Sequence, residues 1–67
     1  MMDLREQRIV EIQASIARAL IKMEGMKAEN MQRGHLGQSM AYTDDSFELI
    51  ISEEQIGYND IIKRLSD

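Results

Sequence analysis

Apolar side chains recur at alternating steps of three and four residues in the first half of the chain. The series runs, in order, through Ile9, Ile12, Ile16, Ala19, Met23 and Met26, and then reaches Asn30. This 3.5-residue period keeps one face of a helix against a neighbouring helix. Because the chain has no proline, nothing forces an interruption. The spacing therefore predicts one long amphipathic helix over about residues 3–33.

The ends of this helix have recognisable signals. Asp3 is a favourable N-cap, and Glu6 lies three residues later, as in a capping box. Arg33 suits the negative end of the helix dipole, and Gly34 is a favourable residue just after the last turn. Gly25 is unfavourable inside a helix by about 1 kcal/mol relative to alanine. We expect it to mark a point of fraying or a hinge.

The apolar part of the predicted helix is wider than a two-helix contact requires. Leu20 and several outer residues, among them Val10, Ala14, Ala17 and Ile21, extend it. At about 100° per residue the arc covers roughly 200°. Such an arc indicates contact with two neighbouring helices, as in a four-helix bundle.

The second half of the chain predicts a loop over 34–43 and a second helix over about 44–65. Thr43 is a favourable N-cap, and Tyr42 and Phe47 have the spacing of a hydrophobic staple. The helix then follows a series of four- and three-residue steps through Phe47, Ile51, Glu54, Tyr58, Ile61 and Leu65. We expect a kink at Gly57. Leu49 and Ile56 lie off this series and need a second neighbour or a partner.

An alternative interpretation of residues 47–51 is a short strand. Ser52 would then be the N-cap of a later helix, with Gln55 completing a capping box. A single strand needs a second one to pair with, and no other segment has strand periodicity. The helix is therefore the preferred interpretation.

Length and composition favour self-association. A chain of 67 residues buries a small core and is marginally stable alone. Small proteins compensate with disulfides, a metal or a partner chain, and this one has no cysteine and a single histidine, His35. We therefore expect an all-α fold: a two-helix hairpin with a long loop, paired with a second copy into an antiparallel four-helix bundle. The predicted oligomer interface consists of Ile9, Ile12, Ile16, Ala19, Leu20, Met23, Met26, Phe47, Ile51, Tyr58, Ile61 and Leu65.

Charge is distributed unevenly along the chain. Residues 1–33 contain six basic and five acidic side chains, whereas residues 34–67 contain two basic and seven acidic ones. Neither half resembles the basic surface that binds nucleic acid directly. The acidic half could instead bind the basic surface of a nucleic-acid-binding protein, as an inhibitor or antitoxin does. The candidate partner-binding residues are His35, Leu36, Met40, Tyr42, Asp44, Asp45, Glu53 and Glu54.

Sequence patterns typical of enzymes, metal sites and membrane proteins are weak. A loop enzyme would use His35, Ser39 and Tyr42 near Asp44 and Asp45, but turn-forming residues explain this segment better. We expect no catalytic, cofactor-binding or metal-binding residues, no membrane segment and a cytoplasmic location. The preferred function is a small non-enzymatic interaction, regulatory or structural subunit that acts as a helical homodimer.

Overall fold

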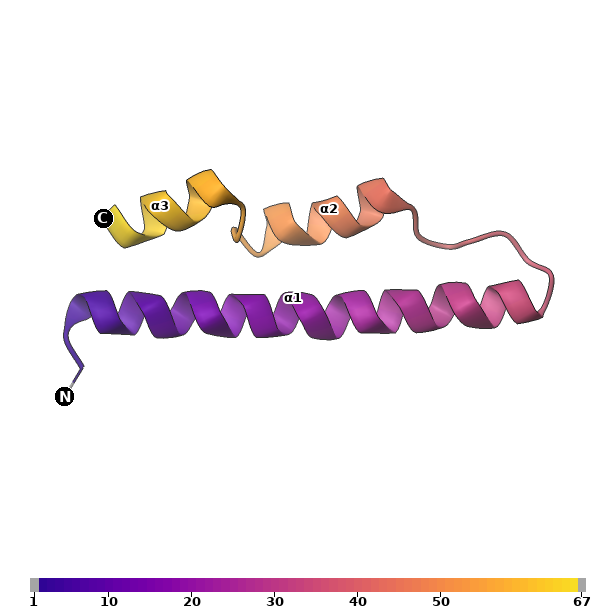
Figure 1. The fold of residues 1–67 in the computed structure, drawn as a ribbon, viewed down its shortest axis with the longest axis horizontal. Coiled ribbons are helices and arrows are strands. Elements are labelled where there is room, and N and C mark those ends of the chain that lie inside the picture. Colours follow the sequence, from indigo (N-terminus) through magenta and orange to yellow (C-terminus); the bar gives the residue numbers. More distant parts are fainter. Residues whose placement is uncertain (1, 67) are drawn as a thin grey trace.

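A computed structural model describes residues 2–66 of the chain as an all-helical hairpin. Its helices are α1 (Leu4–His35), α2 (Asp44–Glu53) and α3 (Tyr58–Ser66). Helices α2 and α3 follow one another in a line antiparallel to α1 (Figure 1). The molecule measures 51 × 23 × 11 Å, and a helix with its side chains is about 10–12 Å wide. The hairpin is therefore a single layer, two helices wide and one helix thick. Residues 47–51 are helical, so the alternative interpretation as a strand is wrong.

The first turns of α1 and α2 form where the cap residues predict them. Asp3 Oδ1 accepts a hydrogen bond from the backbone N–H of Glu6 at 2.8 Å. At the start of α2, the backbone N–H of Thr43 donates to Ser46 Oγ at 3.3 Å. These contacts satisfy backbone groups that the first turn of a helix leaves without partners. Both predicted N-caps, Asp3 and Thr43, are confirmed.

The predicted C-terminal end of α1 is wrong by two residues. Gly34 lies inside the helix, which continues to His35. The left-handed position is taken by Gly37, with φ 73°. The N–H of Gln38 donates to Arg33 O at 2.8 Å, and the N–H of Gly37 donates to Gly34 O at 3.1 Å. These two bonds define a Schellman motif, in which the glycine stands just beyond the cap. Gly37, rather than Gly34, has that role.

The predicted long second helix is interrupted earlier than Gly57. Helix α2 ends at Glu53, and Gln55 adopts φ 56°. The N–H groups of Gln55 and Ile56 donate to Ser52 O and Ile51 O, each at 3.1 Å. This is a second Schellman motif, with a non-glycine residue in the left-handed position. The predicted kink at Gly57 is therefore a break over residues 54–57.

The buried residues of α1 form one line along the helix. They are Ile12, Ser15, Ala19 and Met26. The steps from Ile12 to Ser15 and from Ser15 to Ala19 are of three and four residues, as in a helix–helix seam, and the line faces α2 and α3. Ala19 is only 1% exposed, so its small side chain lies between α1 and the opposite arm of the hairpin. Three of the predicted interface residues, Ile12, Ala19 and Met26, are thus covered within the chain. Helix α1 is continuous through Gly25, and the expected fraying or hinge is not seen.

Candidate interaction surfaces

A polar junction joins α1 to the end of α2. Glu54 Oε1 lies 3.0 Å from Arg18 Nε and 3.7 Å from Lys22 Nζ. The hydrogen bond from Arg18 is the main reason why the pKa of Glu54 lies below its ordinary value of 4.5, although loss of hydration opposes the shift. The Glu54 side chain is only 10% exposed. Glu54 was predicted to bind a partner, but it is held by its own chain.

Ser15 and Arg64 extend this junction to α3. Arg64 Nη1 donates to the carbonyl oxygens of Glu54 at 3.2 Å and Gln55 at 3.1 Å. Arg64 Nη2 donates to Ser15 Oγ at 3.2 Å, and Arg18 Nη2 donates to the same oxygen at 3.1 Å. The Arg64 guanidinium therefore stabilises the turn at Gln55. It also donates a hydrogen bond to the hydroxyl of Ser15, which is buried. Sequence reasoning did not identify Ser15 or Arg64 as junction residues.

The ionisation of Glu54 should make the hairpin sensitive to acid. A carboxyl group with a lowered pKa in the folded state stabilises the fold above its ordinary pKa, and this contribution is lost as pH falls through the lowered value. We expect the melting temperature to fall below pH 4.5 in the unchanged protein, and to fall less in Glu54→Gln. Thermal melts followed by circular dichroism measure this. Glu53→Gln, at the exposed neighbouring position, should retain the original pH dependence of the melting temperature. If both variants lose this pH dependence equally, it does not come from Glu54.

Asn30 attaches the loop to α1. Its Oδ1 accepts hydrogen bonds from the backbone N–H groups of Ala41 and Tyr42, both at 3.0 Å. Its Nδ2 donates to Tyr42 O at 2.9 Å. The sequence contained a signal for this role, since Asn30 is a polar residue at a position of the apolar series. Such residues commonly fix the register of packed helices.

An apolar face lies on one side of the buried line of α1. Successive helical residues are rotated by about 100°, so Leu20 and Arg18, on either side of Ala19 in sequence, lie on opposite flanks. Ile9 and Ile16 each precede a buried residue by three positions, which places them on the flank of Leu20. Their exposed fractions are 39% for Ile9, 37% for Ile16 and 57% for Leu20.

Helix α3 continues this apolar face. Ile62 lies two positions before Arg64, which rotates it by about 160° away from the polar junction. Ile62 is 45% exposed, and Tyr58, one turn earlier, is also exposed. We define the apolar face as the five exposed residues Ile9, Ile16, Leu20, Tyr58 and Ile62. All but Ile62 belong to the predicted oligomer interface. Of its remaining members, Met23, Phe47, Ile51, Ile61 and Leu65 are half-buried between the helices.

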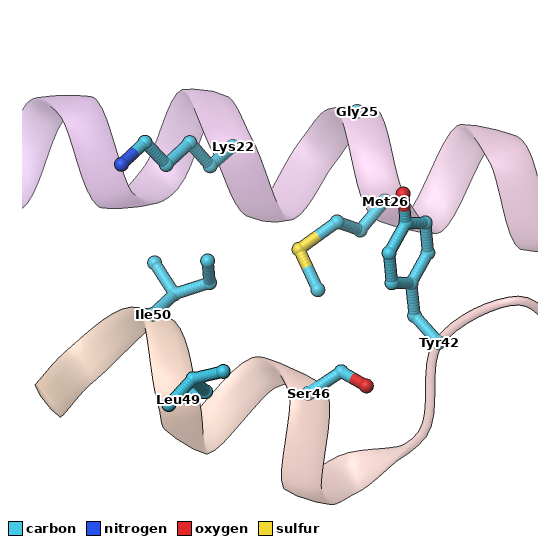
Figure 2. A pocket seen from close by; sticks show the side chains of 7 residues that line it. All are labelled: Lys22, Gly25, Met26, Tyr42, Ser46, Leu49 and Ile50. Carbon is cyan, nitrogen blue, oxygen red and sulfur yellow. The ribbon is translucent and has the colours of Figure 1, made fainter. Parts of the chain in front are cut away.

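A pocket of about 490 Å³ opens on the other flank (Figure 2). It lies between α1, α2 and the end of the loop. In Figure 2 the side chains of Met26 and Ile50 extend into the space between the helices, and the Tyr42 ring closes one end. Gly25 comes one residue before the buried Met26, just as Arg18 comes one residue before the buried Ala19. Both are therefore rotated to the same side of the buried line, which is the flank that carries the polar junction. The pocket lining consists of Lys22, Gly25, Met26, Tyr42, Ser46, Leu49 and Ile50.

The acidic surface of α2 differs from the predicted one in that Glu54 is withdrawn from it. Asp44, Asp45, Glu48 and Glu53 are exposed on α2. The ion pairs found within residues 2–66 use Glu24, Glu29 and Glu54 as their acidic members. The four α2 carboxylates therefore have no cationic partner in this part of the chain, and they form a free acidic surface.

The predicted loop residues do not converge on one site. His35 lies in the last turn of α1, Leu36 is its C-cap, and Leu36 and Met40 are exposed. Tyr42 alone lines the pocket. None of the hydrogen bonds described for residues 2–66 joins His35 to Ser39 or Tyr42.

Between Met2 and Ser66, no group of three or more His, Asp or Glu side chains is arranged to hold a metal ion. None of the helices described over the same range has the length and apolar character needed to cross a membrane. Comparison with protein-family models, curated proteins and solved structures finds no match to this chain.

Proposed function

We propose that this protein is a non-enzymatic interaction subunit that works as a homodimer, built by packing two hairpins through their apolar faces. The observation that supports it is the exposure of Ile9, Ile16 and Leu20 on one flank of α1, next to Ile62 of α3. In the dimer each hairpin supplies one layer of a four-helix bundle. The wide apolar arc of α1 is then used twice, once within the chain and once between chains.

The surface area of the hairpin supports a second copy as the occupant of this face. The accessible surface is 5300 Å², whereas a compact monomer of 7.7 kDa exposes about 4300 Å². The excess is about 1000 Å². A protein–protein interface of standard size covers about 800 Å² on each partner. Face-to-face pairing of two thin layers would therefore bring the surface of each chain close to that of a compact protein.

Charge favours an antiparallel arrangement of the two hairpins. Asp44, Asp45 and Glu48 all lie at the end of the hairpin where α2 begins. A parallel dimer would bring the two copies of this acidic end together, and like charges at close range repel. An antiparallel dimer places them at opposite ends of the bundle.

Light scattering after size exclusion, at several concentrations and with helicity measured on the same samples, tests the proposal. We expect a helical dimer of twice 7.7 kDa that dissociates only on strong dilution, with loss of helicity following dissociation. A well-folded helical monomer at every concentration would rule the dimer out. A poorly helical monomer would mean that the apolar face binds a different protein.

A second candidate function is favoured by the free acidic surface of α2. An acidic protein can cover the basic surface of a nucleic-acid-binding protein and compete with its nucleic acid. Competition that disappears in the variant Asp44→Asn, Asp45→Asn, Glu53→Gln would support this function. The control variant removes two carboxylates outside α2, Glu6 and Glu11 on α1. Equal competition by both variants would remove the candidate.

A further inference from the structure

Two unusual residues meet at the pocket between α1 and α2. Gly25 is a glycine in the middle of a helix, where it weakens the helix relative to alanine. A Cβ atom added to it would meet nothing within 4 Å, so no contact inside the chain requires a glycine there. Leu49 is an apolar residue that is 56% exposed, and it lies among acidic residues of α2, including Asp45 and Glu48. Both residues line the same pocket (Figure 2).

The pocket is open on one side and mainly apolar. Its volume of about 490 Å³ lies in the range of binding pockets, about 300–1000 Å³. Because Gly25 has no side chain, an inserted group can reach the backbone of α1. The cation at the rim is Lys22, whose Nζ lies 3.7 Å from Glu54 Oε1. The same carboxylate oxygen lies 3.0 Å from Arg18 Nε, so these two cations share one carboxylate, and the acidic groups that attract a partner lie farther out, on α2. An apolar group can therefore enter without displacing an ion pair.

The rim of the pocket on α2 carries a specific charge pattern. Asp45, Leu49 and Glu53 are spaced four residues apart, which aligns them along one side of the helix. Leu49 therefore lies between two carboxylates, one turn before it and one turn after it. Neither Asp45 nor Glu53 is in an ion pair within residues 2–66. A partner that covers Leu49 gains two ion pairs if it brings a cation to each of these carboxylates.

From this geometry we infer that the pocket at Gly25 and Leu49 is a docking site for a basic segment of another protein. One large apolar side chain of the segment fills the pocket. Basic residues about one turn to either side pair with Asp45 and Glu53. The inference rests on the proposed function only in that both make the protein a binding subunit. The pocket lies on the flank opposite to the apolar face, so docking and self-association use separate surfaces.

Helical peptides of defined sequence test the site directly. The probe is a lysine–alanine peptide of about 15 residues, long enough to form a helix, with one central phenylalanine. The comparison peptides replace phenylalanine by alanine, or every lysine by glutamate. In ¹⁵N-edited NMR spectra of the dimer, we expect the first peptide to shift the amide signals of Gly25, Ser46 and Leu49. The alanine peptide should bind at least about 10-fold more weakly, and the acidic peptide should not bind.

Two variants separate docking from folding. Gly25→Leu fills the pocket and removes an unfavourable glycine, so it should raise the melting temperature and weaken peptide binding at least about 10-fold. Ala17→Leu adds a leucine at an exposed position of the same helix and should bind normally. Asp45→Asn with Glu53→Gln should weaken binding and remove most of its dependence on salt. Glu6→Gln with Glu11→Gln is the matched charge control.

Three outcomes would overturn the inference. They are no binding of the phenylalanine peptide at millimolar concentration, unchanged binding by Gly25→Leu, and signal shifts at Ile16 and Leu20 in place of Gly25. Light scattering on the same samples keeps this inference distinct from the proposed dimer. A monomer that still shows shifts at Gly25 would remove the dimer and keep the docking site. A dimer without these shifts would do the reverse.

Discussion

Replacing Ile16 with aspartate is expected to convert the dimer into a monomer. Ile16 is 37% exposed in the single hairpin and lies on the apolar face, close to the middle of α1. In the proposed dimer its side chain is covered by the second copy. A carboxylate buried there without a partner costs several kcal/mol, and the symmetry of a homodimer introduces it twice. We expect the dimer dissociation constant to rise at least about 100-fold, as measured by light scattering over a dilution series.

Ile21→Asp is the matched control for this prediction. Ile21 is 73% exposed and lies on the outer side of the same helix, so this change adds the same charge away from the apolar face. It should leave the dimer intact. If Ile21→Asp dissociates the dimer and Ile16→Asp does not, the interface is the outer side of α1, with Val10, Ala14 and Ala17. If neither variant changes the measured mass, the proposed packing is wrong.

The repeat pattern predicted the length of α1 but not the row of residues that its own chain covers. On a helix, neighbouring rows of side chains repeat with nearly the same spacing in sequence, so a repeat pattern cannot tell one row from the next. The apolar arc of α1 is wide enough to contain two such rows. Ile12 and Ala19 belong to the predicted row and are buried. Between them the chain buries Ser15, whereas Ile16 stays partly exposed. This choice depends on Arg64, whose guanidinium reaches Ser15 from 49 positions away in sequence.

Helix starts were predicted more accurately than helix ends. An N-cap depends on a side chain and a backbone N–H only three residues apart, so Asp3 and Thr43 could be identified from sequence. The end of α1 depends on which of two nearby glycines adopts the left-handed conformation, and both Gly34 and Gly37 can do so. The break at Gln55 depends on Arg64 in the following helix. No local signal marks that position.

The candidate docking site was present in the sequence only as two unexplained residues. Gly25 stood out because a helix of this kind disfavours glycine, and Leu49 because it lies off the apolar series of its helix. Each departure from the local pattern was visible separately. Their meeting at one pocket depends on the antiparallel alignment of α2 with α1, which follows from the loop and its attachment at Asn30.

Replacing Ile12 with alanine should remove most of the stability of the fold. Ile12 is 7% exposed and is one of few buried apolar side chains in the hairpin. Large-to-alanine changes at such positions typically cost about 2–5 kcal/mol, because the cavity closes only in part. At about 0.05–0.15 kcal/mol per residue, the free energy of unfolding of a chain this size is about 3–10 kcal/mol. Urea unfolding at one fixed protein concentration measures the difference, since dimer stability depends on concentration.

Ile21→Ala makes the same chemical change at an exposed position of the same helix. It should alter the free energy of unfolding by no more than about 0.5 kcal/mol, because Ile21 loses little contact. Ile16→Ala should fall between the two variants, and its cost should come from the dimer interface. Equal effects at positions 12 and 21 would mean that α2 and α3 do not cover α1 along the line of Ile12 and Ala19. This outcome would contradict the packing of the hairpin and the position of the apolar face that follows from it.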